Sequence, residues 1–229
     1  MCKLNIKLFL IFLLVIFNTL NIVSSPTIGG TTGLILMPTA DSLNYKEFNL
    51  ASDWLVYSGD NDNDIIWKYK ANIGVFNGLE IGFVGQNNKE GVFINIKYYL
   101  LSDNTKNPIK VAIGIDNISS YDKTDTYMVA SKRFNKKISG HFGFLVDIAG
   151  GEANSSLMLG AEYLIDDKFV AVADLKGEES KYIFNLGTRY FLNDNLLLSL
   201  FILNLADQDI SVEYPETMLA FGISWTDFL

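Results

Sequence analysis

Strict alternation of side-chain character constrains this chain most strongly, and it is clearest over residues 181–204. From Tyr182 to Tyr190, every second residue belongs to one largely apolar set, and the residues between them include asparagine, glycine and arginine. A polar turn follows at residues 193–195, and leucines then alternate from Leu196 to Ile202. A period of two is the signature of a β-strand with one apolar and one polar face. This stretch therefore predicts a β-hairpin.

The same pattern continues along the chain from residue 46 onward. We expect about twelve strands, at residues 46–58, 64–76, 79–86, 91–101, 109–117, 125–134, 138–148, 155–165, 168–175, 181–191, 195–204 and 217–227. Most of them exceed the roughly five to six residues of an average soluble strand. They reach the roughly 9–11 residues with which a tilted strand crosses a bilayer.

The predicted fold is all-β, an antiparallel transmembrane β-barrel of about 12 strands. The composition agrees, because 49% of the residues are hydrophobic and only 19% are charged. The alternative is a soluble secreted β-barrel or sandwich, whose strands alternate in the same way. We divide the chain into a signal peptide (1–25), an irregular lead-in (26–45) and the barrel (46–229).

The connections between the expected strands differ in length. Those near residues 77–78, 135–137, 166–167 and 192–195 are tight, whereas those at 58–63, 118–124, 149–154, 176–180 and 205–216 are longer and more polar. Outer-membrane barrels have short periplasmic turns and long outer loops. The last stretch, from Met218 to Leu229, alternates and carries Trp225 and Phe228. It resembles the C-terminal signal that the barrel-assembly machinery reads. We therefore expect a bacterial outer-membrane location.

Residues 1–25 have the layout of a signal peptide. Lys3 and Lys7 provide a positive start, Leu8–Phe17 is an unbroken apolar run, and the small residue Ser25 offers a cleavage point. The alternative is a retained membrane anchor, but a spanning helix needs roughly 20 apolar residues. We therefore expect this segment to direct export.

Charge and cysteine content exclude several classes of function. The net charge of −8 argues against a nucleic-acid partner, because phosphates require a basic surface. Cys2 is the only cysteine and lies in the expected signal peptide. The exported chain therefore has no disulfide framework, no cysteine metal site and no thiol nucleophile. We expect no cofactor.

The polar faces of the strands carry charged residues that we expect to line the lumen. They are Lys68, Lys70, Lys97, Lys110, Asp116, Lys132, His141, Asp147, Glu162, Asp174 and Arg189. One interpretation is a selectivity lining for a charged or sugar-like solute. The other is that these residues pair with one another and fill a narrow barrel. The sequence leaves both open.

Two patterns that suggest chemistry are weak. Residues 60–64 read Asp-Asn-Asp-Asn-Asp, but a calcium loop also needs glycine at its sixth position and glutamate at its twelfth, where this chain has Ile65 and Ala71. The single histidine, His141, shares a strand face with Ser139, as in a hydrolase pair, but the sequence shows no orienting partner for it. We expect a solvated hairpin tip and a histidine within a polar lumen network.

The lead-in carries a recognisable motif. Residues 30–40 read Gly-Thr-Thr-Gly-Leu-Ile-Leu-Met-Pro-Thr-Ala, and residues 45–50 read Tyr-Lys-Glu-Phe-Asn-Leu. This opening resembles that of the YjbH family, outer-membrane β-barrel proteins linked to exopolysaccharide production. The matching residues are Gly30, Thr32, Gly33, Leu34, Ile35, Pro38, Thr39 and Ala40. The resemblance covers only this opening, and the family offers no catalytic residues to carry over.

The resemblance implies a short, single-barrel protein without enzyme activity that aids exopolysaccharide export or surface organisation. A small passive, porin-like solute channel is the alternative, and a soluble secreted β binding protein is the second. The expected partners are outer-membrane lipid, the barrel-assembly machinery through the C-terminal strand, and polysaccharide. Nucleic acid is not among them.

Overall fold

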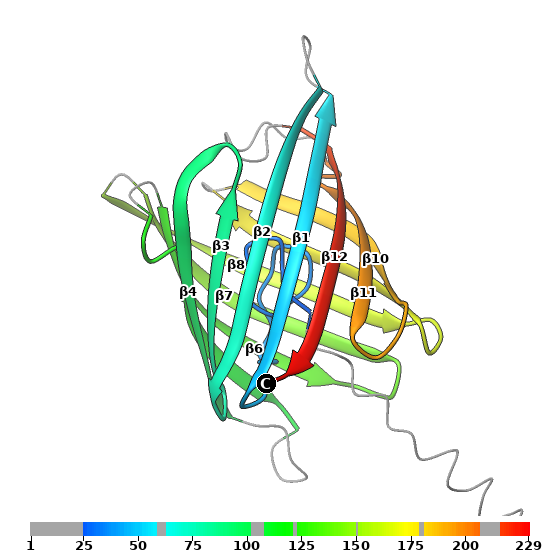
Figure 1. Cartoon of the computed structure of the whole chain (residues 1–229). Helices are drawn as coiled ribbons and strands as arrows, with labels where there is room; N and C mark the ends of the chain where they lie inside the picture. Colours follow the sequence, from blue (N-terminus) through cyan, green and yellow to red (C-terminus); the bar gives the residue numbers. More distant parts are fainter. Residues whose placement is uncertain are drawn as a thin grey trace, which may run out of the picture.

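The computed structural model describes residues 25–58, 63–101, 108–120, 123–149, 151–178, 181–206 and 216–229. These residues form one closed antiparallel barrel (Figure 1). Its strands are β1 (Glu47–Ser58), β2 (Asn63–Phe76), β3 (Leu79–Gln86), β4 (Lys89–Leu101), β5 (Lys110–Asp116), β6 (Lys123–Arg133), β7 (Ile138–Ala149), β8 (Glu152–Leu164), β9 (Phe169–Glu178), β10 (Lys181–Phe191), β11 (Leu196–Leu203) and β12 (Met218–Phe228). The predicted barrel of twelve strands is confirmed, with boundaries within about three residues of the expected ones.

The first and last strands close the barrel. β1 pairs with β12 from Glu47 opposite Phe228 to Val56 opposite Leu219. The Leu229 N–H adds a further backbone bond to the Lys46 carbonyl, at 2.9 Å. Every strand therefore has two neighbours, and the sheet has no free edge. A single closed sheet differs from the alternative of a soluble sandwich.

The outer wall of the barrel is apolar. On β12, Leu219 and Phe221 are 47% and 48% exposed, whereas the alternating residues Met218 and Ala220 are fully buried. Large exposed apolar side chains also occur on β1, β2, β4, β7, β8 and β10. In water such a continuous surface would be unfavourable, whereas lipid acyl chains solvate it. No helix in the described part of the chain is long and apolar enough to span a membrane.

Two of the predicted long connections are wrong. β7 continues to Ala149 and β8 begins at Glu152, and residues 179–180 alone separate β9 from β10. The polar residues assigned to these loops, among them Asn154 and Lys176, lie on strands and alternate with outward apolar positions. Their polarity reflects an inner face rather than a loop. Most of the Asp-rich stretch 60–64 lies outside the described residues.

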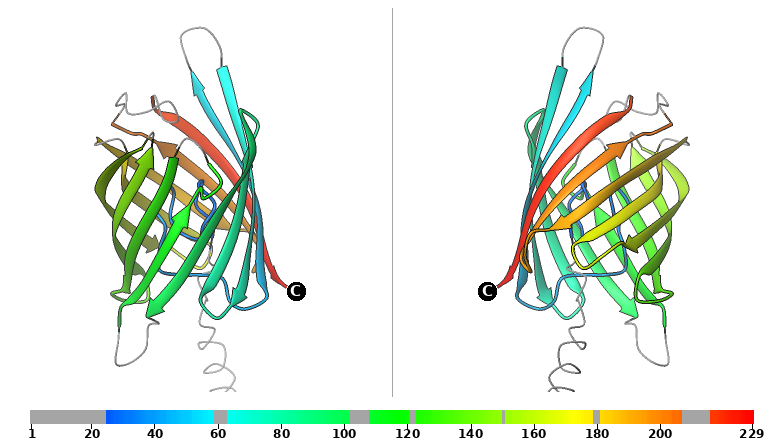
Figure 2. Two further views of the ribbon diagram at one scale, coloured as in Figure 1. Left: turned by 90° about the vertical axis from the view of Figure 1, so that its left-hand side faces the viewer. Right: turned by 90° about the vertical axis from the view of Figure 1, so that its right-hand side faces the viewer.

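Residues 25–46, which we call the plug, run inside the barrel (Figures 1 and 2). The plug has no regular secondary structure, only isolated bridges between Pro26 and Thr32 and between Gly33 and Pro38. Most of its residues are buried. It leaves the lumen along β2, where a Cβ on Gly74 would lie 1.8 Å from the Asn44 carbonyl oxygen. The lead-in expected to be irregular is thus the filling of the barrel.

Candidate functional site: a lumen filled by the plug

The charged residues expected in the lumen are placed by the alternation of each strand. Lys68, Lys70, Lys97, Asp116, His141, Asp147, Asp174 and Arg189 are buried inside the barrel, and Lys110 and Glu162 are half-buried. Unpaired charges in such surroundings would be very unfavourable, so their partners determine what this lumen can do.

Lys132 is a correction to that set. The buried residues of β6 are the odd-numbered ones from Asp125 to Ser131, so Lys132 belongs to the outward series. Its ammonium lies 5.6 Å from the centre of the Phe134 ring, on the exposed side of the barrel. The polar character of the strand end, where aromatic and basic residues gather at a membrane interface, explains the wrong orientation.

Asp174 on β9 anchors the plug through three backbone hydrogen bonds. Its Oδ2 atom accepts hydrogen bonds from the backbone N–H groups of Ile35, Leu36 and Met37, at 2.9, 2.8 and 2.9 Å. The plug makes a tight turn here, in which the Leu34 N–H bonds to the Met37 carbonyl at 2.9 Å. Consecutive N–H groups in a turn form a concave anion site. The Asp174 carboxylate fills that site from the barrel wall.

Arg189 on β10 binds the backbone carbonyl groups at the start of the same turn. One of its guanidinium nitrogens, Nη2, donates to the Gly33 and Leu34 carbonyl oxygens, at 2.9 and 2.5 Å. Another, Nη1, lies 3.7 Å from Glu162 on β8. Asp174 and Arg189 thus recognise both the donors and the acceptors of one short backbone segment.

Glu80 and Lys97 form a second clamp on the opposite wall. β3 and β9 face each other because five strands separate them in either direction around the barrel. Glu80 accepts the Thr32 N–H at 2.8 Å and the Leu43 N–H at 3.1 Å. Lys97 on β4 lies 3.5 Å from that carboxylate and donates to the Thr32 carbonyl at 2.8 Å. The plug is therefore held across the full width of the lumen.

Sequence reasoning missed Glu80, although it lies on the polar face of an expected strand. The signal was available, because Glu80 alternates with the apolar residues Leu79 and Ile81. Its partner Lys97 was predicted to line the lumen. What the sequence lacked was any sign that plug backbone, rather than another side chain, would satisfy this carboxylate.

Further bonds attach the plug along its length. Lys70 donates to the Thr27 carbonyl at 2.8 Å and pairs with Asp53 on β1, and Asn95 donates to the Gly29 carbonyl at 2.8 Å. Near the plug's exit, Lys110 pairs with Asp41 at 2.6 Å. Partial burial raises the pKa of Asp41, but the Lys110 ammonium, helped by His141 and Lys97, outweighs this and lowers that pKa below its ordinary value.

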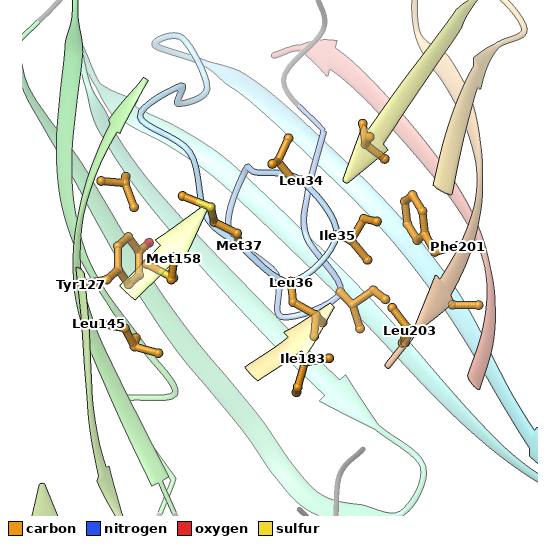
Figure 3. Close-up of a cluster of buried hydrophobic side chains, with 14 of the residues drawn as sticks. Leu34, Ile35, Leu36, Met37, Tyr127, Leu145, Met158, Ile183, Phe201 and Leu203 are labelled. Carbon is orange, nitrogen blue, oxygen red and sulfur yellow. The ribbon is translucent and has the colours of Figure 1, made fainter. Parts of the chain in front are cut away.

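One side of the lumen is apolar. The plug residues Leu34–Met37 pack against inward side chains of β6, β7, β8, β10 and β11 (Figure 3), namely Tyr127, Leu145, Met158, Ile183, Phe201 and Leu203. Gly160 on β8 makes room for them, because a Cβ there would lie 2.2 Å from Leu34 Cδ1 and 3.1 Å from Met37 Sδ. The turn is therefore fitted to this wall by shape as well as by hydrogen bonds.

His141 belongs to the polar network that holds the plug. Its Nδ1 lies 2.8 Å from Ser131 Oγ, and Ser131 Oγ also accepts the Ala40 N–H at 2.9 Å. Its Nε2 lies 3.7 Å from Glu162. The hydrogen-bonded neighbour of the histidine is Ser131, across the β6–β7 pair, and not Ser139, the residue considered for a hydrolase pair. This agrees with the expected polar lumen network.

No protein-family model and no curated protein matches the sequence. Solved structures match the fold. A KdgM porin aligns with a TM-score of 0.60 at 11% identity, over 79% of this chain and 99% of that chain. The COG4313 outer membrane channel from Pseudomonas putida F1 aligns at 0.53 and 9%, over 83% and 98%. A NanC porin aligns at 0.52 and 13%, over 80% and 99%.

These likenesses concern the fold, since identity is low throughout. The architecture is that of outer-membrane porin-type barrels. The apolar outer wall is the lipid-facing surface that such a barrel requires. Fold and surface together indicate a barrel of a bacterial outer membrane.

Proposed function

We propose that this protein is a porin-like outer-membrane channel whose lumen is closed by its own plug. The observation that carries the proposal is the pair of buried clamps on opposite walls, where Glu80 and Asp174 bind plug backbone. On this proposal, the filled lumen is closed to solutes. Passage of a solute therefore requires the plug to move.

The way in which the plug is attached supports movement rather than a permanent core. Within residues 25–39 the described backbone–backbone bonds join one part of the plug to another, as between Ile28 and Ile35 at 2.9 Å. The walls reach this segment through side chains. Residues 25–39 can therefore leave as a unit without breaking the hydrogen-bonded ladder of the barrel, which closes on itself through β1 and β12.

Planar-bilayer conductance of the refolded full-length protein tests this proposal. The wild type is expected to show no stable conductance steps. The double variant Glu80→Gln/Asp174→Asn weakens both clamps and is expected to open in discrete steps. Lys132→Gln, which removes an outward lysine, is the matched control and should behave as the wild type does. Stable steps of one size in wild type and double variant alike would contradict a closing plug.

The resemblance of the lead-in to YjbH proteins supports a second proposal, a role in exopolysaccharide export or surface organisation. In this chain the motif residues build the plug, and a Cβ on Gly33 would lie 2.4 Å from the Met37 carbonyl oxygen. Such tight packing accounts for the presence of the motif residues without any role in binding a glycan. Deleting the gene and measuring surface polysaccharide tests the role, and unchanged polysaccharide would remove it while leaving the channel proposal intact.

A further inference from the structure

The plug turn Leu34–Met37 is bound in the way that a binding site binds a ligand. Asp174 accepts three consecutive N–H groups, and Arg189 donates to two consecutive carbonyls. The recognition is directed at backbone, and the four side chains are apolar. Both wall residues are almost fully buried, so each bond forms away from water.

The wall side of this contact is held in place by the barrel itself. Asn185 on β10 donates to Asp174 Oδ1 at 2.7 Å, which leaves Oδ2 directed at the turn. The Arg189 guanidinium lies 5.8 Å from the centre of the Phe201 ring and 3.7 Å from Glu162. These supports belong to strands rather than to the plug. A site whose polar groups are oriented by their own neighbours is preorganised for binding.

The surrounding wall is unusual for a water-filled pore. Tyr127, Leu145, Met158, Ile183 and Phe201 point inward and belong to the same buried apolar cluster as the turn (Figure 3). If the turn leaves, this surface meets water, and an apolar occupant is then favoured in its place. The wall thus combines a carboxylate, a guanidinium and an apolar floor.

We propose that this wall is a binding site for a short apolar peptide in a turn conformation, which Leu34–Met37 occupies from within the same chain. The ligand chemistry follows from the contacts: consecutive free amide N–H groups for Asp174, adjacent carbonyls for Arg189, and branched or thioether side chains for the floor. The inference names the ligand class of the lumen and rests on the proposed function in one respect, because the turn must be displaceable.

The test uses the full-length variant Ile35→Asp/Leu36→Asp, which places two carboxylates in the buried apolar cluster and is expected to expel the turn. The probe is a fluorescent synthetic peptide with the sequence of residues 31–40 and blocked ends, and the readout is fluorescence anisotropy in detergent. The peptide is expected to bind this variant at least about tenfold more tightly than it binds the wild type, whose site is occupied. Equal binding to both proteins would overturn the proposal.

A matched peptide identifies the contact. Methylating the amide nitrogens at the positions of Ile35, Leu36 and Met37 removes the donors for Asp174 and keeps the apolar side chains. This peptide is expected to bind at least about tenfold more weakly, because hydrogen bonds to a charged acceptor are lost. Equal binding of the methylated and unmodified peptides would show that apolar contact alone accounts for binding, and would refute the proposed site.

Controls separate this inference from the channel. Adding Asp174→Asn to the variant should weaken peptide binding, whereas adding Lys132→Gln should not. Heat-modifiable gel migration checks folding, and Leu36→Asp alone replaces the double variant if the latter does not fold. Conductance is recorded on the same protein. Steps without peptide binding would refute the peptide site and leave the channel standing, whereas peptide binding without steps would refute the channel alone.

Discussion

A double-mutant cycle between Gly160 and Leu34 probes the fit of the plug in the lumen. An alanine at position 160 places its Cβ 2.2 Å from Leu34 Cδ1, whereas carbon atoms prefer roughly 3.5–4.0 Å. Leu34 is fully buried, so its side chain has little space to turn aside. Overpacking lowers the free energy of unfolding by about 1–3 kcal/mol. Replacing glycine by alanine also restricts the unfolded chain, which raises the free energy of unfolding by about 0.4–1 kcal/mol. We expect Gly160→Ala to destabilise the folded protein by about 1–2 kcal/mol.

The second arm of the cycle removes the clashing atom. Leu34→Ala alone should cost about 2–5 kcal/mol, as expected for a buried leucine. In the double variant the new methyl group enters the space that leucine vacated. Its free energy of unfolding should therefore exceed the additive value by about 1 kcal/mol or more.

Urea unfolding of the barrel in lipid vesicles, followed by the fluorescence of its three tryptophans, measures the four proteins of the cycle. Leu34 and Gly160 are far apart in sequence, so coupling between them requires the plug to lie against β8. Additivity within about 0.5 kcal/mol would refute that placement.

Three further outcomes follow from the contacts. Asp174→Asn should speed hydrogen exchange at the three plug amides that Asp174 binds by about tenfold or more, because a neutral acceptor forms weaker hydrogen bonds than a carboxylate does. Hydrogen-exchange mass spectrometry of the folded barrel measures this. The Asp41–Lys110 pair should add under about 1 kcal/mol, because it is half-exposed. The pKa of Asp41 is lowered in the folded protein, so this stabilisation should be fully present above pH 3.8, the ordinary pKa of an aspartate, and should be lost as the pH falls through the lower pKa of the folded state. Measuring the free energy of unfolding of the wild type and of Asp41→Asn as a function of pH tests this. Lys132→Gln should leave plug exchange and conductance unchanged, because its side chain lies outside the barrel.

The barrel could be predicted from the sequence because its signal is local. On β12, alternation alone separates Leu219, Phe221 and Ile223 from the inward residues, and the same period runs through much of β5, β6 and β8. The error at Lys132 arose where alternation ends and polar side chains gather on both faces. The expectation of long loops near Asn154 and Lys176 was wrong for a related reason, because polar residues occur on an inner strand face as well as in a turn.

The plug could not be predicted because its conformation is set from a distance. Residues 25–46 have neither a helical nor a strand period, and several of their backbone polar groups bond to the side chains of Glu80, Lys97, Asp174 and Arg189. One signal was present: an apolar stretch rich in glycine and threonine stands directly before a barrel whose inner face carries many charged residues. The plug needs the charged inner face to bond its backbone, and the inner face needs the plug to pair its charges. An interpretation that takes the strands one at a time does not reveal this dependence.

Hydrogen exchange of the plug itself tests the central claim most directly. In the folded wild-type barrel, the amides of Ile35, Leu36 and Met37 bond to a buried carboxylate, so their exchange should be nearly as slow as that of the flanking strands. Exchange of these three amides within seconds, while the strands stay protected, would place the segment outside the lumen and contradict the account.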